Sequence, residues 1–263
     1  MSKNQTSIQK AIDKSRRSQS EDSGSGIFRL FQTVQTDDEI MEESRLVSKI
    51  DDRTAITAYK IMRTRVLQRM RSNNWRSLLV TSTGAGEGKT LTASNLALSL
   101  SWNVNQSVLL VDLDLQRSKV AEYFGIDVGF GKGIGDYLNE DAEFPDIVYS
   151  PSDLPRISII PNRESIENSS DLLASPRMRE FLARIREQSD RTIVIYDMPP
   201  VLAGDDVLAF CPEVDAVLLV VTQGITDRSL LEKAMVLLEE TNLLGVVLNK
   251  SGEMAGENYY GYY

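Results

Sequence analysis

Runs of Val, Ile and Leu recur along most of the chain and alternate with segments whose apolar residues are spaced three or four positions apart. The apolar runs predict strands at residues 77–83, 107–115, 157–162, 192–198, 216–224 and 243–250. The spaced segments predict helices at 54–72, 89–102, 118–125, 175–189 and 227–241. Strands that are apolar on both faces and separated by helices are typical of parallel sheets. The pattern therefore predicts an α/β fold, with helices on both faces of a mostly parallel sheet.

The two ends of the chain fall outside this alternation. Residues 1–52 are rich in Ser, Gln, Asp and Glu, a composition that predicts a largely disordered segment. Ile8, Ala11 and Ile12 have helical spacing, so a short helix that docks on a partner is the alternative for part of it. Residues 251–263 are glycine-rich and predict a flexible tail. We therefore expect one folded domain, at 53–250, between the two.

The composition excludes several kinds of enzyme. The chain has no histidine, which excludes Ser-His-Asp and Cys-His catalysis and histidine metal sites. Its single cysteine, Cys211, excludes an intrachain disulfide and is expected to be a buried thiol. No apolar run reaches the length of a membrane-spanning helix, and the N-terminus lacks the apolar core of a signal peptide. We therefore expect a cytoplasmic protein that reaches the membrane only through a partner.

The charge is unevenly distributed. The formal net charge of −9 predicts repulsion from nucleic acid and from anionic lipid, so we expect no nucleic-acid partner. Residues 53–77, in contrast, contain Lys and Arg but no acidic residue. A basic helix face of this kind indicates either a protein partner or a solvated surface.

A glycine-rich segment, TGAGEGKT at 83–90, joins the first of these strands to the helix at 89–102. Glycines let the backbone turn tightly and point its N–H groups at phosphate oxygens, and the helix N-terminus adds partial positive charge. Lys89 is then placed to reach the β- and γ-phosphates, and Thr90 to bind Mg²⁺. The segment departs from the strict P-loop pattern at Thr83, which replaces the first glycine. We expect the nucleotide to be bound by Gly84, Ala85, Gly86, Glu87, Gly88, Lys89, Thr90 and Leu91.

Three aspartates lie at the predicted ends of two other strands. Asp112 and Asp114 end the strand at 107–115, and Asp197 ends the strand at 192–198. Because the carboxyl ends of parallel strands meet at one edge of a sheet, these acids are expected beside the glycine-rich loop. The alternative for Asp114 is a turn or helix cap without a chemical role. We expect Lys89 and the three aspartates to be catalytic, with Thr90, Asp114 and Asp197 placing Mg²⁺.

Together these segments resemble the bacterial tyrosine kinase family, which is tied to capsule and exopolysaccharide synthesis. The resemblance rests on GEGKT (86–90), LLVDLDLQR (109–117) and VIYDMPP (194–200), in the family's order. It extends to NSSDLLASPRM (168–178), where Ser169 replaces the family's proline and Asp171 its glutamate. It implies a P-loop NTPase fold and one site for ATP and Mg²⁺, with Asn249 near the adenine. It also implies Asp112 as the first choice for the proton acceptor, although the assignment among the three acids stays open.

The C-terminal sequence, ENYYGYY, matches the same family, whose members end in tyrosines that neighbouring subunits phosphorylate. The resemblance implies four phosphoacceptors, Tyr259, Tyr260, Tyr262 and Tyr263. Residues 251–263 can extend to roughly 40 Å at about 3.3 Å per residue, far enough to reach the site of another subunit. The expected activity is therefore ATP-dependent autophosphorylation in trans that regulates capsule or exopolysaccharide synthesis and export.

The resemblance also implies partners. It predicts a homo-oligomer and a separate transmembrane polysaccharide co-polymerase or adaptor, which recruits the chain to the inner face of the cell membrane. The helix at 54–72 retains Arg63 of the family's subunit-packing element but has Thr57 and Lys60 at its other positions. Two alternatives stay open: a nucleotide-binding regulator with little kinase activity, and a positioning ATPase of the MinD/ParA type. Such ATPases have an extra lysine early in the loop, where this chain has Gly84.

Overall fold

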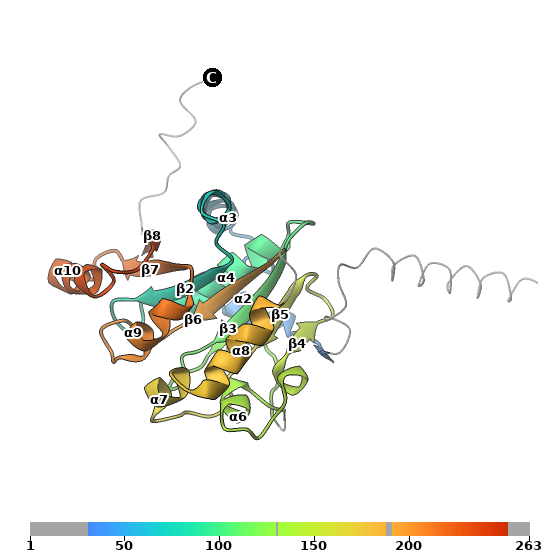
Figure 1. Ribbon diagram of the computed structural model, residues 1–263. Coiled ribbons are helices and arrows are strands. Elements are labelled where there is room, and N and C mark those ends of the chain that lie inside the picture. The colour runs from blue at the N-terminus through green and yellow to red at the C-terminus, as the bar shows by residue number, and fades with distance from the viewer. Residues whose placement is uncertain (1–30, 130, 188–190, 252–263) are drawn as a thin grey trace, which may run out of the picture. The chain divides into compact units, whose positions relative to one another are not determined.

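The computed structural model describes residues 31–129, 131–187 and 191–251 (Figure 1). Its strands are β1 (Gln32–Val34), β2 (Ser77–Ser82), β3 (Ser107–Asp112), β4 (Tyr149–Pro151), β5 (Ile157–Ile160), β6 (Thr192–Asp197), β7 (Ala216–Thr222) and β8 (Leu243–Asn249). They form one sheet in the order β1-β4-β5-β3-β6-β2-β7-β8. Neighbouring strands are parallel except for β4 and β5, which are antiparallel. The predicted mostly parallel α/β sheet is confirmed.

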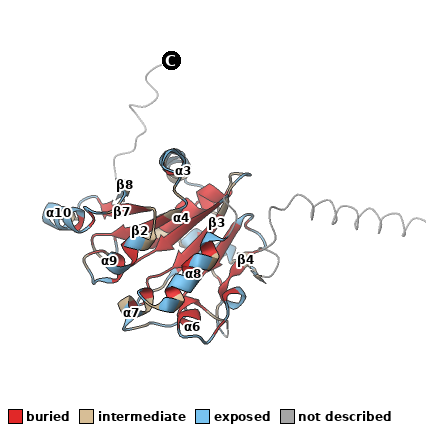
Figure 2. Ribbon diagram, in the orientation of Figure 1, coloured by how far each residue is buried: buried red, intermediate tan, exposed pale blue. Residues whose placement is uncertain are grey.

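Helices cover both faces of this sheet (Figure 1). They are α2 (Asp38–Glu43), α3 (Arg53–Ser72), α4 (Lys89–Ser101), α5 (Val120–Tyr123), α6 (Ile134–Leu138), α7 (Ser169–Leu173), α8 (Pro176–Arg186), α9 (Asp206–Phe210) and α10 (Arg228–Leu237). Buried side chains of α3 and α4 contribute to one hydrophobic core, and those of α6, α8 and α9 contribute to another. The outer sides of the helices are exposed, whereas the central strands are buried (Figure 2).

Successive strand residues enter opposite cores, because side chains alternate across a strand. Leu78 and Val80 of β2 lie in the core beneath α3 and α4, while Leu79 lies in the core beneath α8. All three are fully buried. The central strands are therefore continuous apolar runs, and their carboxyl ends are held rigidly at one edge.

Local sequence signals set the ends of the longer helices. Ser175 precedes α8 and its hydroxyl accepts the N–H of Met178, and Pro176 occupies the first helical position, as predicted. Asp52 caps α3 by accepting the N–H groups of Thr54 and Ala55. These caps satisfy backbone donors that a helix leaves without partners in its first turn.

The folded part begins earlier than the predicted boundary at residue 53. Residues 31–52 were expected to be largely disordered, but β1 pairs with β4 and α2 packs into the core with Met41 fully buried. The N–H of Val47 donates to Asn95 Oδ1 in α4 at 2.8 Å. The docking helix predicted around Ile8 and the tail at 252–263 lie outside the described residues.

Candidate active site

The glycine-rich loop connects β2 to α4 at the carboxyl edge of the sheet. Gly86 and Gly88 have φ angles of 78° and 90°, in the left-handed region that favours glycine. A Cβ atom added to Gly84 or Gly86 would meet no atom within 4 Å, so the loop faces open space at both positions. Nearly every residue of α4 is buried, which fixes the helix N-terminus beside that space. Both the room and the donor N–H groups suit a phosphate chain.

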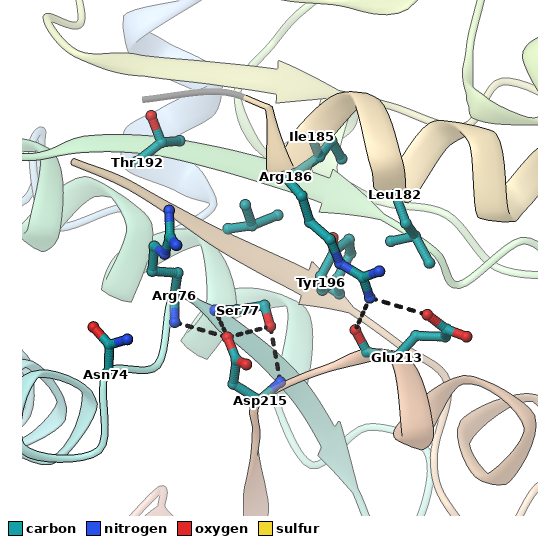
Figure 3. Close-up of a pocket in the computed structure, with 11 residues that line it drawn as sticks. Asn74, Arg76, Ser77, Leu182, Ile185, Arg186, Thr192, Tyr196, Glu213 and Asp215 are labelled. Atoms are coloured by element: carbon teal, nitrogen blue, oxygen red, sulfur yellow. Dashed lines mark hydrogen bonds and ion pairs between the residues drawn. The ribbon is translucent and has the colours of Figure 1, made fainter. Parts of the chain in front are cut away.

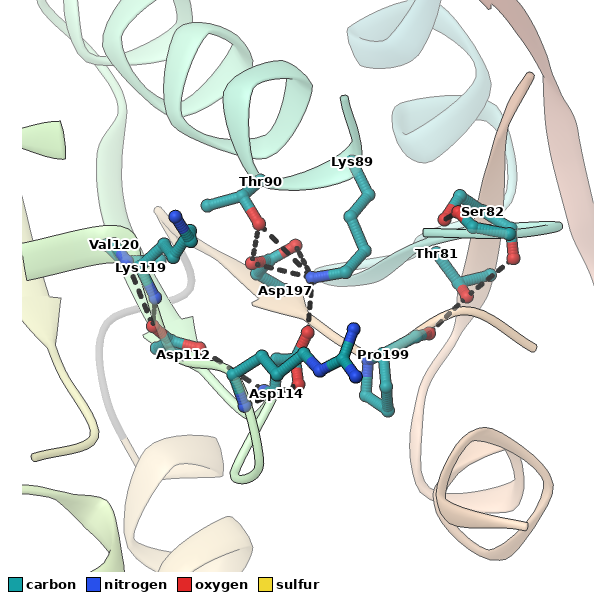
Figure 4. Close-up of polar contacts among 12 residues, drawn as sticks. Thr81, Ser82, Lys89, Thr90, Asp112, Asp114, Lys119, Val120, Asp197 and Pro199 are labelled. Carbon is teal, nitrogen blue, oxygen red and sulfur yellow. Dashed lines mark hydrogen bonds and ion pairs between the residues drawn. The ribbon is translucent and has the colours of Figure 1, made fainter. Parts of the chain in front are cut away.

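Lys89 connects the loop to Asp197, at the end of β6, and to Asp114, in the loop after β3 (Figure 4). Its Nζ lies 2.8 Å from Asp114 Oδ2 and 3.3 Å from Asp197 Oδ2. Thr90 Oγ1 donates to Asp197 Oδ2 at 2.6 Å and lies 3.1 Å from Lys89 Nζ. The structure therefore brings together four of the residues that the sequence analysis selected, from three separate segments.

Asp112 lies next to Asp197, because β3 and β6 are neighbours and pair these two residues in register. Its side chain is fully buried and every oxygen has a backbone partner. Oδ2 accepts the N–H groups of Lys119 and Val120 at 2.9 and 3.0 Å, and Oδ1 accepts the N–H of Asp114 at 3.2 Å. Asp112 thus also fixes the turn that leads into α5. Strand β3 ends at Asp112, so Asp114 lies in the following loop instead of in the predicted strand.

Burial and mutual repulsion shift the protonation of this cluster. Burial, followed by the charge of Asp197, raises the pKa of Asp112 to about 8. Burial also raises the pKa of Asp197, against the opposing effects of Lys89 and Thr90. For Lys89, burial lowers the pKa, but the charges of Asp197 and Asp114 outweigh it and the net pKa is raised. The ammonium therefore stays charged, and acidic groups outnumber it.

This donor set fits a magnesium nucleotide. Mg²⁺ prefers hard oxygen ligands and is usually held by one or two carboxylates together with substrate phosphates. The hydroxyl of Thr90 and the carboxylates of Asp114 and Asp197 supply such oxygens beside the loop. The excess of negative charge, which burial makes unfavourable, is what a divalent cation offsets.

Asn249, expected near the adenine, lies against the back of the loop at the end of β8. Its Nδ2 donates to the carbonyl of Glu87 at 2.9 Å. Gly88 has a φ of 90°, and a Cβ atom there would lie 2.1 Å from that nitrogen, so both the backbone and the close contact favour glycine. Lys250 Nζ donates to the carbonyl of Gly86 at 3.0 Å. Sequence analysis did not select Lys250, although it directly follows Asn249.

The sequence analysis also missed a group of hydrogen bonds around Ser169. Ser169 stands where the resembling family has proline, and its hydroxyl donates to Asp206 Oδ2 at 2.7 Å. The amide of Gln116 donates to Ser169 Oγ at 3.2 Å. These side chains tie the loop after β3 to α7 and α9. The departure from the family pattern at Ser169 was the available signal, but its partners come from distant segments.

The residues of the predicted subunit-packing element lie on α3. Arg63 Nη1 donates to the carbonyl of Ser99 at 3.0 Å, which holds α3 against α4. Thr57 Oγ1 donates to the carbonyl of Arg53 within the helix, and Lys60 is exposed. The four tail tyrosines lie outside the described residues.

A cavity of about 260 Å³ lies at the opposite, amino end of the central strands (Figure 3). Ser77 and Thr192, which begin β2 and β6, line it together with α8 side chains. Its charged groups are engaged within the protein: Arg186 pairs with Glu213 at 3.1 Å, and Asp215 accepts the N–H of Ser77 at 2.8 Å. The lining includes no residue of the glycine-rich loop and none of Asp112, Asp114 and Asp197, so the cavity is separate from the candidate active site.

The fold and this loop define a class, the P-loop nucleotide-binding proteins. Residues 78–260 match the family described as CobQ/CobB/MinD/ParA nucleotide binding domain. The structure of the septum site-determining protein MinD from Pyrococcus horikoshii, complexed with Mg-ADP, has the same fold. Its TM-score is 0.57 and its identity 23%, over 67% of this chain and 71% of that one.

Within that class, the chain belongs to the bacterial tyrosine kinase family. It is 31% identical to the tyrosine-protein kinase CpsD of Streptococcus agalactiae over 189 residues, which are 71% of this chain and 80% of that protein. It is 28% identical to YwqD of Bacillus subtilis over 207 residues, 78% of this chain and 84% of that one. The VpsO kinase domain superposes with a TM-score of 0.66 at 30% identity, over 76% of this chain and 96% of that domain. The chain is therefore assigned to the protein-tyrosine kinases. In the described ranges, no helix combines the length and the apolar character needed to cross a bilayer.

Proposed function

We propose that this chain is an ATP-dependent tyrosine autokinase that acts in trans. It transfers the γ-phosphoryl group of ATP to tyrosines at the C-terminus of another copy: Tyr259, Tyr260, Tyr262 and Tyr263. The observation that supports this proposal is the cluster of Lys89, Thr90, Asp114 and Asp197 beside the open glycine-rich loop. The sequence supplies the acceptor, a tail with four tyrosines in its last five residues.

The chain's own groups hold the nucleotide. The N–H groups of Thr83 and Gly84 donate to Glu87, so the later loop N–H groups and the α4 N-terminus bind phosphate oxygens. The Lys89 ammonium offsets charge on the transferring group. Thr90, Asp114 and Asp197 would hold Mg²⁺, and the bound ion would neutralise negative charge on the phosphates. Asn249, whose side chain is held against the loop, lies on the side of the site that would receive the adenine.

Transfer forms a bond between the tyrosine oxygen and the γ-phosphorus, breaks the bond from that phosphorus to the β–γ bridging oxygen, and releases ADP. The phenol has a pKa of about 10, so a carboxylate that accepts its proton assists the attack. Asp112 is the first choice, because the resemblance to the family implies this role for it. Both oxygens of Asp112 already accept backbone N–H groups. Asp114 is the second choice, because its carboxylate is 4% exposed and lies beside Lys89.

The proposed setting is capsule or exopolysaccharide synthesis. A transmembrane co-polymerase or adaptor, as a separate chain, would bring this kinase to the inner face of the membrane. Copies of the kinase would assemble there, so that the tail of one reaches the site of the next. Autophosphorylation would then change the charge of the assembly, since each phosphotyrosine adds about −1.5 to −2.

Transfer in trans is tested by mixing two variant chains, one with a disabled site and an intact tail and one with an intact site and no tail. A Lys89→Met chain keeps its tail but loses the phosphate-binding ammonium, and a chain truncated after Glu257 keeps the site but loses the tail. Each variant is incubated with Mg-ATP by itself, and the two are then incubated together. Phosphotyrosine is detected by antibody and by mass spectrometry. Circular dichroism of both variants controls for folding.

We expect phosphotyrosine on the Lys89→Met chain only in the mixture. Asp112→Asn, introduced into the truncated chain, identifies Asp112 as the base by a loss of roughly 10²- to 10⁴-fold in transfer with Mg-ADP binding retained. Asp114→Asn should weaken Mg-ADP binding as well, because Asp114 is a proposed Mg²⁺ ligand. ATP hydrolysis without phosphotyrosine in the wild-type chain would favour a positioning ATPase instead. Mg-ADP binding with neither reaction would favour a nucleotide-binding regulator.

A further inference from the structure

Glu87 lies within the glycine-rich loop, but its side chain is turned into the protein and is only 3% exposed. Its Oε2 accepts the N–H groups of Thr83 and Gly84 at 2.7 and 3.0 Å. Its Oε1 accepts the hydroxyl of Thr83 at 2.6 Å and the hydroxyl of Thr226. One carboxylate therefore has four donors, two from backbone and two from side chains.

The backbone of Glu87 is held as firmly as its side chain. Its carbonyl accepts the hydroxyl of Thr222, at the end of β7, at 3.0 Å. It also accepts Nδ2 of Asn249, at the end of β8, at 2.9 Å. Thr226 lies in the turn between β7 and α10, and its hydroxyl is the acceptor for the N–H of Thr222 at 2.8 Å. A single loop residue thus connects the loop to the ends of two neighbouring strands.

We propose that Glu87, with Thr83 and Thr226, is a positioning residue that keeps the loop in its nucleotide-binding conformation before the nucleotide arrives. Glu87 acts through the loop backbone and does not itself touch the phosphates. The inference rests on the nucleotide binding proposed above. It also gives Thr83 a reason to stand where the strict pattern has glycine, because its hydroxyl supplies one of the four donors.

The physical basis is preorganisation. A loop that is disordered without ligand must be ordered on binding, and the lost backbone entropy weakens the affinity. Four hydrogen bonds to one buried side chain can hold the loop against that entropy. A buried carboxylate is costly unless its oxygens are satisfied, which Thr83, Gly84 and Thr226 achieve together.

The hydrogen-bond geometry offers a conservative variant. In Glu87→Gln, the amide oxygen can still accept both N–H groups, while the NH₂ group can donate to the two threonine hydroxyls, which reverse their roles. Glu87→Ala removes all four contacts, and Thr226→Val removes one without changing the side-chain shape. Glu232→Ala is the matched control, since Glu232 is an exposed glutamate on α10 that pairs only with Arg228 within the described residues.

The experiment measures the dissociation constant of Mg-ADP by calorimetry, and amide hydrogen exchange of residues 78–91 in the nucleotide-free protein. We expect Glu87→Ala to weaken binding by about 10-fold or more and to speed exchange in the loop. Glu87→Gln and Glu232→Ala should bind within about threefold of wild type. Thr226→Val should have a smaller effect than Glu87→Ala. The double variant should lose less than the sum of the two single effects, because the two residues share one contact, although the Thr226 hydroxyl also accepts the N–H of Thr222.

The proposal is overturned if Glu87→Ala binds Mg-ADP as wild type does with unchanged loop exchange. It is also overturned if Glu87→Gln loses as much affinity as Glu87→Ala, since charge and not hydrogen bonding would then matter. Failure of the proposed kinase activity is distinguishable, because a wild-type chain that binds Mg-ADP without phosphorylating tyrosine leaves this test intact. A wild type that does not bind Mg-ADP overturns the proposal together with the nucleotide binding on which it rests.

Discussion

Replacing Asp112 by asparagine should make the nucleotide-free protein progressively more stable, relative to wild type, as the pH rises. Asp112 is fully buried beside Asp197, and burial raises its pKa from 3.8 to about 8. A carboxyl with a raised pKa binds its proton more tightly in the folded state than in the unfolded state. Its contribution to stability is therefore fully present below about pH 4 and is lost as the pH rises toward about 8. Asparagine has no proton to lose, so the variant lacks this loss.

The magnitude follows from the linkage between proton binding and stability. One proton held by the folded state and not by the unfolded state changes the unfolding free energy by about 1.4 kcal/mol per pH unit. Between pH 5.5 and 7.5, the advantage of Asp112→Asn over wild type should therefore grow by at most about 3 kcal/mol. Coupling to Asp197 reduces this value, because the two carboxyls share the same unfavourable environment. A constant offset is also expected, since the amide NH₂ cannot accept the N–H of Asp114 as Oδ1 does.

Urea unfolding of both proteins, followed by circular dichroism in buffer with EDTA and no nucleotide, measures the difference at each pH. The change of the difference with pH carries the test, because the lost hydrogen bond contributes equally at every pH. A difference that stays flat from pH 5.5 to 7.5, or that shrinks, would refute the assignment of the raised pKa to Asp112. Comparing the two proteins at each pH cancels the titration of groups that they share.

Two further predictions concern groups away from the nucleotide. Burial raises the pKa of the Cys211 thiol to about 11. At pH 7.5 its reaction with Ellman's reagent should therefore be about 100-fold slower than that of free cysteine, and unfolding in urea should restore the free-cysteine rate. Reaction of the folded protein at the free-cysteine rate would contradict the burial. Asp215 accepts the N–H groups of Arg76 and Ser77 and the Ser77 hydroxyl, each at 2.8 Å, so Asp215→Ala should lower the unfolding free energy by about 2–3 kcal/mol and leave Mg-ADP binding unchanged. An effect below about 0.5 kcal/mol in urea unfolding would show that water replaces this carboxylate.

The central elements could be predicted from sequence because their signals are local and strong. The strand predicted at 192–198 is β6 (Thr192–Asp197), and the helix predicted at 89–102 is α4 (Lys89–Ser101). Continuous apolar runs and a glycine-rich turn leave few other folds for such segments. The predicted neighbourhood of Lys89, Asp114 and Asp197 followed from one topological rule, that parallel strands end at the same edge.

The sheet margin could not be predicted, because its elements are short and depend on distant partners. Strands β1 and β4 have three residues each, and β4 includes Pro151. In residues 31–52, the buried Met41 and Leu46 are separated by acidic residues, so the segment has the composition of a disordered chain. It folds because α4 and the rest of that core offer an apolar surface, which is a tertiary effect.

The inward orientation of Glu87 was equally inaccessible. A glutamate inside a phosphate-binding loop is naturally assigned to the ligand, and the sequence analysis included it among the nucleotide-binding residues. Its donors Thr83 and Gly84 are near in sequence, but Thr226 is 139 residues away. Only the adjacency of β2, β7 and β8 brings that turn to the loop.

The site and the fold make opposite demands on the three aspartates. Each is at most 4% exposed, and with Lys89 nearby they leave more negative than positive charge in the interior. Burying such charge destabilises the protein, so a chain selected for stability alone would hold apolar residues at these strand ends. A magnesium nucleotide changes the balance, because it supplies the cation that the carboxylates lack and binds only the folded state. Bound magnesium nucleotide should therefore offset the destabilisation that the three aspartates cause. Substitutions that relieve the repulsion should stabilise the nucleotide-free protein and weaken nucleotide binding.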